Sequence, residues 1–322
     1  MVPSGAISLA MYASVGKVGI TSVELATSQA FYNMVFASSS LRNFIFSRLE
    51  KASDNDEWLP LVSTGTQSNL NADKIKNWCI SVPNSNEQKL VGEFFKKLDN
   101  LLTLHQRKYE KLLNIKKSML EKMFPKEGEV VPEIRFKGFT GAWEQRKIGD
   151  YLTLSKIPGH TGVDAKKLTV KLWGKGVVEK TDIYGGSQNT QYYVRRAGQF
   201  MYGKLDFLHA AFGIVPKSLD RFESTLDSPA FDLHEIDGAF LQNRVTQQNF
   251  YLKFGNIANG SRKAKRIHEV TFLDMPIVVP SYAEQKKIGA FLNKLDSLLT
   301  LHQRKLEMLK NVKQAFLEKM FV

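Results

Sequence analysis

Two stretches of the chain carry apolar residues at alternating steps of four and three, which is the pattern of a helix that packs along one seam. The first seam consists of Phe94, Leu98, Leu101, His105, Lys108, Leu112, Ile115 and Met119. The second consists of Phe291, Leu295, Leu298, His302, Lys305, Leu309, Val312 and Phe316. The pattern predicts one long helix over residues 84–124 and another over residues 281–322. Both seams are apolar at their ends and polar in the middle, so we expect them to pack on each other.

The two stretches are copies of one sequence. Leu98–Lys108 recurs as Leu295–Lys305 with a single change, at an offset of 197 residues. Glu-Gln-Lys at 87–89 recurs at 284–286 with the same offset. A repeat this long indicates a duplicated unit of globular domain plus helix, because solenoid repeats have periods of roughly 20–50 residues.

The ends of both helices are marked in the sequence. Asn84 with Glu87, and Ser281 with Glu284, have the spacing of capping boxes, in which two side chains satisfy free backbone N–H groups. Pro125 ends the first helix, because proline cannot continue one.

The order of domains and helices predicts how the helices pair. Each helix follows its own globular part, so an antiparallel pair places the two parts at opposite ends. The alternative is two separate helices, each docked on its own domain.

The residues between the helices predict a mixed, strand-rich domain. Runs with strand character are Leu168–Trp173, Gln191–Val194, Gln199–Tyr202, Ala210–Val215 and Asn249–Phe254, with a late apolar segment at Val270–Val279. The fold class is therefore α+β. We divide the chain into a partial first domain (1–83), a helix (84–124), a linker (125–132), a complete second domain (133–280) and a second helix (281–322).

The first globular part is a shortened copy of the second. Gly5–Leu9 matches Gly198–Tyr202, and Gly19 falls near the position of Gly213. About 60 residues of the second domain have no counterpart upstream of these matches. We expect the strands of residues 1–83 to expose unpaired edges, and a second chain to be needed before this part reads DNA.

Composition favours a polyanionic partner. The chain has 322 residues, a net charge of +13 and a pI near 9.5, and a folded protein this basic usually binds nucleic acid. Cys79 is the only cysteine, which excludes a disulfide framework. The sequence shows neither a signal peptide nor an apolar run long enough for a membrane span, so we expect a cytoplasmic protein that is not bound to membranes.

Motifs for catalysis are missing. The sequence has no phosphate-binding loop of the G-x-x-x-x-G-K-[ST] type, and its six histidines do not cluster. The Glu-x-Lys pattern at 87–89 and 284–286 resembles half of a nuclease site, but acids in a first helical turn favour the helix dipole. We therefore assign no catalytic residue, no metal ligand and no cofactor to this chain.

Basic and amide side chains lie near aromatic residues in the second domain. Lysine and arginine neutralise phosphates, and Asn, Gln and Arg hydrogen-bond to base edges. The candidate DNA-binding residues are Lys166, Lys167, Gln188, Asn189, Arg195, Arg196, Lys204, Gln242, Asn243, Arg244, Arg262, Lys263, Lys265 and Arg266. Lys171, Trp173, Gln247 and Gln248 lie in the same segments.

The duplicated pattern resembles a type I restriction-modification specificity subunit. In that family, each target recognition domain is followed by a long helix that contains Glu-Gln and a Leu-Asp-x-Leu-Leu segment, as in Pro280–Ile288 and Leu295–Lys305. Pro132–Phe139 with Trp143 resembles the opening of such a domain, Gly198–Lys204 its central strand, and Ser224–Phe231 a following loop. The first recognition domain lacks its opening and is truncated relative to this pattern.

The resemblance implies a function. Such a subunit reads a split, asymmetric sequence of double-stranded DNA, one half per domain, while the helices set the gap between the halves. It docks methyltransferase subunits and restriction/translocase subunits, and these partners bind S-adenosylmethionine, ATP and Mg. A second specificity chain is a further candidate partner, and the subunit itself catalyses nothing.

Two other functions stay open from the residues. One is a stand-alone, sequence-specific DNA-binding regulator that dimerises through its long helices. The other is an interaction scaffold whose positive charge is incidental. Salt-dependent DNA binding separates the scaffold from the other two, and copurification with a methyltransferase separates the specificity subunit from the regulator.

Overall fold

The structure is a computed structural model and describes residues 1–62, 69–162, 164–181, 188–256 and 266–321. The chain divides into two compact units. Unit 1 comprises residues 1–111 and 300–322, and unit 2 comprises residues 112–299. Each unit therefore contains one globular part together with portions of both long helices. The division cuts across the limits that we expected for the domains, which remain a prediction.

Unit 1 contains a small antiparallel sheet with the strand order β2-β1-β3. Its elements are β1 (Ile7–Ala10), β2 (Val18–Ile20), β3 (Phe31–Met34), α1 (Ser39–Asp54), η1 (Leu59–Leu61), α2 (Ala72–Lys76) and most of α3 (Ser85–Lys122). Ile7 and Leu9 of β1 are fully buried and pack with Phe44 of α1 and Phe95 of α3 in one hydrophobic cluster. The sheet is thus fastened to the start of α3.

Unit 2 contains a larger set of strands. They are β4 (Glu144–Lys147), β5 (Leu152–Ser155), β6 (Pro158–Thr161), β7 (Leu168–Val170), β8 (Val177–Glu179), β9 (Gln191–Val194), β10 (Phe200–Tyr202), β11 (Phe212–Ile214), β12 (Glu223–Ser224), β13 (Ala230–Leu233) and β14 (Pro276–Val279). The main sheet has the order β11-β10-β13-β5, and a second sheet has the order β12-β9-β6. Two antiparallel pairs, β14-β4 and β7-β8, complete the set.

The helices of unit 2 cover these strands. They are η2 (Ile148–Asp150), η3 (Phe207–His209), η4 (Lys217–Leu219), α4 (Gly238–Val245), α5 (Gln248–Gly255), α6 (Glu269–Leu273) and the first half of α7 (Tyr282–Met320). The aromatic core joins Phe200 and Tyr202 of β10 to Phe240 of α4 and Phe272 of α6. The core reaches Ile288 and Leu292 of α7, so the sheet of unit 2 is fastened to the start of that helix.

One strand prediction was wrong, and the late apolar segment, which carried no element assignment, is mixed. Asn249–Phe254 lies in the helix α5, where Phe250 and Tyr251 are buried and Leu252 and Lys253 are exposed. Val270–Val279 divides into the helix α6 and the strand β14. Short apolar runs do not distinguish a strand from a buried helical turn, and tertiary packing decided both cases.

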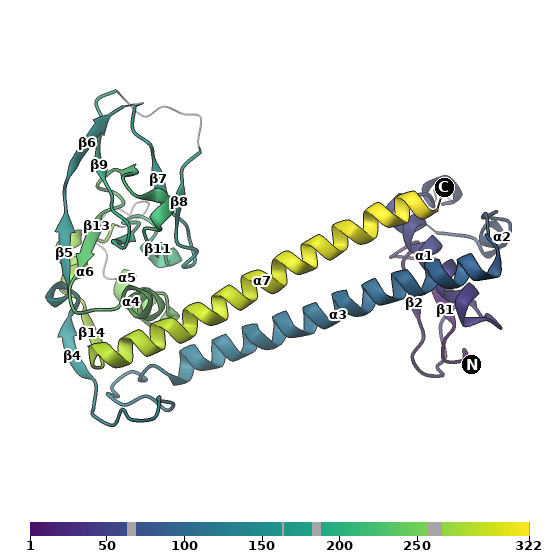
Figure 1. The fold of residues 1–322 in the computed structure, drawn as a ribbon, viewed down its shortest axis with the longest axis horizontal. Coiled ribbons are helices and arrows are strands. Elements are labelled where there is room, and N and C mark those ends of the chain that lie inside the picture. Colours follow the sequence, from purple (N-terminus) through teal and green to yellow (C-terminus); the bar gives the residue numbers. More distant parts are fainter. Residues whose placement is uncertain (63–68, 163, 182–187, 257–265, 322) are drawn as a thin grey trace. The chain divides into compact units, whose positions relative to one another are not determined.

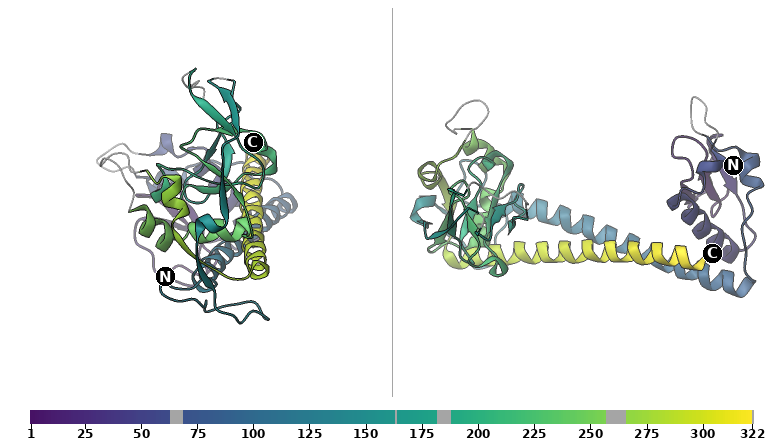
Figure 2. Two further views of the ribbon diagram at one scale, coloured as in Figure 1. Left: turned by 90° about the vertical axis from the view of Figure 1, so that its left-hand side faces the viewer. Right: turned by 90° about the horizontal axis from the view of Figure 1, so that it is seen from above.

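α3 and α7 lie side by side in opposite directions (Figure 1). In unit 1, the ring of Phe94 lies 4.9 Å from that of Phe316, and His105 contacts His302. In unit 2, Lys116 pairs with Asp296 at 2.5 Å. Residue numbers rise along α3 as they fall along α7, so the pair is antiparallel, as we expected from the order of domains and helices. Figure 2 shows the end of α7 within unit 1, where the Phe321 and Phe44 ring centroids are 5.0 Å apart.

The contacts of the helix pair repeat as the sequence does. Lys116–Asp296 in unit 2 has its counterpart in Lys313–Asp99 in unit 1, at 2.6 Å. Each of these residues lies 197 positions from its equivalent. The identity of Asp99 with Asp296, and of Lys116 with Lys313, was visible in the sequence and could have predicted both ion pairs.

The predicted capping boxes formed only in part. Asn84 Oδ1 accepts hydrogen bonds from the backbone N–H groups of Asn86 and Glu87, both at 3.1 Å. Glu284, however, binds Arg135 through Nε at 2.9 Å and Nη2 at 2.6 Å, and it is only 1% exposed. The Glu284 carboxylate therefore accepts two hydrogen bonds from the charged guanidinium of Arg135 instead of the expected bond from the backbone N–H at the helix start.

Among the described residues, no helix is both long and apolar enough to cross a membrane.

Candidate nucleic-acid interface

The hairpin β7-β8 carries an exposed tryptophan at its tip. Leu168, Val170 and Val177 bury one face of the hairpin in a small core. In the turn between the strands, Trp173 adopts a φ of 62°, a conformation that is uncommon for residues other than glycine. Its N–H donates to the carbonyl of His209 at 2.7 Å, and its side chain is 54% exposed. An exposed indole flanked by Lys171 and Lys175 provides a flat surface on which a base can stack.

Two of the predicted lysines lie at the base of this hairpin. The backbone of Lys167 forms a bridge with Glu223, and its Nζ lies 5.1 Å from the ring centroid of Tyr192. The carbonyl of Lys166 accepts a hydrogen bond from the Glu223 N–H at 2.7 Å, and the Lys166 side chain is exposed. The hairpin thereby joins the second sheet at β12 and β9.

Three further candidates lie beside β9. Gln188 and Asn189 are exposed in a turn just before the strand, and Arg196 is exposed just after it. The backbone N–H of Arg196 donates to Gln199 Oε1 at 2.8 Å, and this hydrogen bond fixes the backbone at Arg196.

The amide side chains of α4 lie at the other end of the hairpin. Gln242 Nε2 donates to the carbonyl of Gly174 at 3.3 Å, and Asn243 Nδ2 donates to the carbonyl of Ala239 at 2.8 Å. Both line a cleft of ≈ 140 Å³ that Trp173 and Gly174 also border. The hairpin therefore connects three of the predicted segments: its base meets the lysines and β9, and its tip meets α4.

Arg244 is largely occupied within the protein. Its Nη1 donates to Gln247 Oε1 at 2.8 Å and to Asn249 Oδ1 at 3.2 Å, and the guanidinium lies over the ring of Phe250. Burial lowers the pKa of Arg244 to about 10. The side chain remains charged at neutral pH, but it orders the start of α5 instead of extending into solvent.

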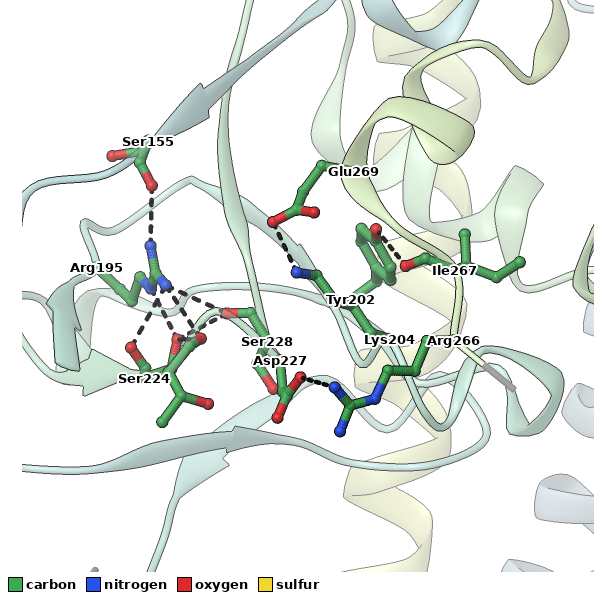
Figure 3. A network of polar contacts seen from close by, with 11 residues as sticks. Ser155, Arg195, Tyr202, Lys204, Ser224, Asp227, Ser228, Arg266, Ile267 and Glu269 are labelled. Carbon is green, nitrogen blue, oxygen red and sulfur yellow. Dashed lines mark hydrogen bonds and ion pairs between the residues drawn. The ribbon is translucent and has the colours of Figure 1, made fainter. Parts of the chain in front are cut away.

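Arg195, which we expected to contact DNA, is fully buried (Figure 3). Its Nε donates to Ser224 Oγ at 2.8 Å, and its Nη1 donates to the Ser155 carbonyl at 3.1 Å. Its Nη2 lies 3.4–3.5 Å from the carbonyls of Ser224, Thr225 and Ser228. Burial lowers the pKa of Arg195 to about 10. The guanidinium holds the 224–228 loop from inside, and we leave Arg195 out of the candidate surface.

Lys204 is also buried, at 7% exposure, and forms an ion pair with Glu269 at 2.7 Å. Burial raises the pKa of Glu269, but the hydrogen bond from Lys204, a backbone hydrogen bond and the charges of Lys204 and Lys156 together outweigh this effect, so the net pKa is lowered. The hydroxyl of Tyr202 donates to the Ile267 carbonyl at 2.9 Å nearby. These contacts fasten residues 267–269 to β10, so Lys204 has a structural role in place of the predicted DNA contact.

The last basic segment is only partly described. Arg262, Lys263 and Lys265 lie outside the described residues. Arg266 is exposed, and its Nη1 lies 3.6 Å from Asp227 of the loop that Arg195 holds (Figure 3). Arg266 therefore lies beside the 224–228 loop.

The residues predicted for the seam of the helix pair are buried or half-buried at most positions and exposed at a few. Leu98 and Leu295 are 8% and 7% exposed, and Leu112, Phe94, Phe291 and Leu309 pack on the hydrophobic clusters of the two units. Leu101, by contrast, is 42% exposed, while its neighbour Leu102 is half-buried. In the second copy, Leu298 is half-buried and Leu299 is 9% exposed. Adjacent leucines satisfy the periodicity equally well, and only the packing distinguishes them.

His105 and His302 meet at the seam, as expected from their equivalent positions. Their Nδ1 atoms are 2.8 Å apart, so one ring donates to the other. Burial, His302 and the lysines Lys305 and Lys108 lower the pKa of His105. A neutral His105 fits this contact, because two imidazolium rings would repel each other.

Comparison with known proteins finds a matching family model and similar folds. Residues 1–114 match the family model of the type I restriction modification DNA specificity domain. The fold is similar to that of the type I restriction-modification S subunit from M. genitalium, with 14% identity, a TM-score of 0.66, and coverage of 100% of this chain and 84% of that chain. The HsdS subunit from Thermoanaerobacter tengcongensis matches with 15% identity, a TM-score of 0.46, and coverage of 99% and 81%.

Proposed function

We propose that the chain is a type I restriction-modification specificity subunit and that residues 133–280 form its sequence reader for double-stranded DNA, which the family match over residues 1–114 and the similar fold support. The observation that carries this proposal is the hairpin β7-β8, which joins exposed lysines, an exposed tryptophan and the amides of α4. Phosphate contacts would come from Lys166, Lys167, Arg196 and Arg266, and base contacts from Gln188, Asn189, Gln242 and Asn243.

The partners and the location follow from the family. We propose that the target is bipartite and that the helix pair docks methyltransferase subunits, which in turn recruit restriction/translocase subunits in the cytoplasm. The chain supplies recognition, and its partners supply the chemistry. The repeated ion pairs and the paired histidines support the role of the helices as a fixed connection.

Salt-dependent binding tests the phosphate surface. Replacing Lys166, Lys167, Arg196 and Arg266 by alanine should weaken binding to all DNA sequences and reduce the slope of log K against log salt by about 0.9 for each phosphate that is no longer neutralised. The measurement is fluorescence anisotropy with labelled duplexes from low to physiological salt. The matched control removes Lys89, Lys96, Lys97 and Lys108, four exposed lysines of α3 in unit 1. Equal effects of both variants would show that the binding is not localised to unit 2.

Base contacts are tested by selectivity. Gln242→Ala or Asn243→Ala should cost about 1–3 kcal/mol on the cognate sequence and relax preference at particular base pairs. Binding to unrelated DNA should stay the same. The cognate sequence comes from methylome sequencing of cells that express the chain with its methyltransferase. A methyltransferase that fails to copurify with the chain would favour the stand-alone regulator instead.

A further inference from the structure

We propose that His160 is a further phosphate contact of the DNA reader and that the buried carboxylate of Glu223 keeps its imidazole ring charged. The inference rests on the proposed function. It adds a histidine to a surface for which only lysine, arginine and amide side chains were predicted. His160 lies on β6, the edge strand of the sheet β12-β9-β6, and its side chain is 65% exposed.

The carboxylate of Glu223 makes two contacts with His160. Its Oε2 accepts a hydrogen bond from the backbone N–H of His160 at 2.8 Å, and its Oε1 lies 2.5 Å from the ring nitrogen Nδ1. The Glu223 side chain is only 3% exposed. An ionised carboxylate is costly to bury unless an opposite charge and hydrogen bonds compensate it. The imidazolium form of His160 supplies this charge.

Gly159 provides the space for the carboxylate. A Cβ on Gly159 would lie 2.3 Å from Glu223 Oε2 and 2.5 Å from Glu223 Cδ. These distances are too short for any side chain, so another residue at position 159 would displace the carboxylate. The backbone of β6 is thus fitted to the Glu223 side chain, and the His160 ring is held against a carboxylate that packing fixes in place.

The protonated ring has a second N–H group that is free to bind a ligand. Because Nδ1 faces the buried carboxylate and most of the side chain is exposed, Nε2 of His160 is open to solvent. A charged N–H donor of this kind forms short, strong hydrogen bonds with phosphate oxygens. The hydrogen bond to Glu223 and the charge of Glu223 raise the pKa of His160 above its ordinary value of 6.5. The ring therefore stays charged at a higher pH than an isolated histidine.

His160 lies beside residues that were placed on the DNA-binding surface. The backbone of Glu223 forms a bridge with Lys167, so one residue connects the histidine to that lysine. Gly162, two residues after His160, packs closely on Gln188, because a Cβ on Gly162 would lie 3.0 Å from Gln188 Cα. The ring is therefore next to both a predicted phosphate contact and a predicted base contact.

The charges around His160 determine how it titrates. Glu223 has the largest effect, and Asp164 of the segment after β6 raises the pKa of His160 further, while burial lowers it. The neighbouring strand β9 has the sequence Gln-Tyr-Tyr-Val and carries no charge at neutral pH. The nearby cation of Lys167 lies over the ring of Tyr192, with Nζ 5.1 Å from the ring centroid. Removal of the Glu223 charge should therefore be the change that moves the titration of His160 most.

Salt-dependent DNA binding at two pH values tests the phosphate contact. At about pH 6, where the ring is charged, His160→Gln should reduce the slope of log K against log salt by about 0.9. The reduction should be equal on the cognate duplex and on a duplex of mixed sequence, because phosphates carry no sequence information. The difference between the variant and the unchanged chain should disappear as pH rises through the pKa of His160. His234→Gln is the matched control, since His234 is an exposed histidine of unit 2 whose ring contacts the Thr153 hydroxyl.

Glu223→Gln tests the role of the carboxylate as a positioning group. Glutamine keeps the shape and can still accept the hydrogen bond from the His160 N–H, but it removes the charge. The pKa of His160 should fall toward 6.5, and the loss of DNA affinity should move to lower pH. NMR titration of the histidine ring protons measures this pKa without DNA, and His160→Gln assigns the signal. If Glu223→Gln does not fold, the comparison of His160→Gln with the unchanged chain still decides.

Three results would overturn the inference. They are equal salt slopes for His160→Gln and His234→Gln, an effect of His160→Gln confined to one base sequence, and a titration of His160 that Glu223→Gln leaves unchanged. Failure of the proposed function looks different, because the unchanged chain would then bind no DNA at either pH. Binding by the unchanged chain that His160→Gln leaves intact at both pH values would refute the histidine contact alone.

Discussion

Arg195 and Arg196 show how two identical side chains acquire different roles. They are adjacent in sequence at the end of β9, yet Arg195 is fully buried and Arg196 is exposed. Successive residues of an extended segment point to opposite faces, but the sequence does not say which face is inside. The carbonyls of the 224–228 loop decide the matter, because they satisfy a guanidinium that would otherwise be too costly to bury.

Replacement of Arg195 should therefore lower the free energy of unfolding. Arg195→Met keeps much of the volume but removes one donor from each of the carbonyls of Ser155, Ser224, Thr225 and Ser228, so we expect a loss of about 3 kcal/mol in the free energy of unfolding. Chemical denaturation measures it. Arg196→Met is the control and should change stability by about 0.5 kcal/mol or less, while weakening DNA binding. A stable Arg195→Met variant with weakened DNA binding would restore Arg195 to the interface.

At the scale of elements, two glycines let short helices dock on the long ones. A Cβ at Gly92 would lie 3.0–3.2 Å from Ser40, Asn43 and Phe44 of α1. A Cβ at Gly289 would collide with Asp237 Oδ1 and lie 3.1 Å from the backbone nitrogen of Phe240. Asp237 caps α4 by accepting a hydrogen bond from Phe240 N–H at 2.9 Å. The two glycines are equivalents in the repeat, so each unit uses the same close approach.

Alanine at these positions should destabilise the protein despite its higher helix propensity. Overpacking costs roughly 1–3 kcal/mol and exceeds the gain of about 1 kcal/mol from replacing a helical glycine. We expect Gly289→Ala to cost more than Gly92→Ala, because it also disturbs the cap of α4. Gly19→Ala in β2 is the control, since a Cβ there meets nothing within 4 Å. Thermal unfolding provides the comparison, and a stabilised Gly289→Ala would refute the tight docking.

At the scale of the whole molecule, each of the two units has its own main hydrophobic cluster, and each of these clusters includes residues of both long helices. Unit 1 also contains a partly buried ionic cluster, in which Lys313 binds Glu50 at 2.8 Å and Asp99 at 2.6 Å. Burial raises the pKa of Glu50 to about 6, against the opposing effect of Lys313. We expect the two units to unfold in two separate transitions. Only the transition of unit 1 should change with the protonation of Glu50.

The pH dependence of the unit 1 transition should follow from this carboxyl group. Because the pKa is higher in the folded state than in the unfolded state, the folded state binds more protons between pH 4.5 and 6. Stability therefore falls as pH rises through this window, by about 2 kcal/mol. Glu50→Gln should remove that slope from the unit 1 transition and leave the unit 2 transition unchanged, as followed by calorimetry from pH 4 to 7. Glu93→Gln, at an exposed acid of the same unit, is the control.

The sequence by itself determined the duplication, the two long helices and their antiparallel pairing. Periodic apolar residues and repeated segments are local or internal signals, and they need no knowledge of the tertiary fold. The meeting of His105 with His302 followed from the same argument. The family resemblance rested on the order of motifs along the chain, and residues 1–114 match the family model.

The tertiary structure decided which of two adjacent residues is buried, as at Arg195 and Arg196 or Leu101 and Leu102. It also decided that Asn249–Phe254 is helical and that Glu284 binds Arg135 instead of capping its own helix. Each outcome depends on atoms far away in sequence, which supply the carbonyls, the apolar surface or the opposite charge. Composition and spacing carry no information about those partners, so only the folded chain selects between the alternatives.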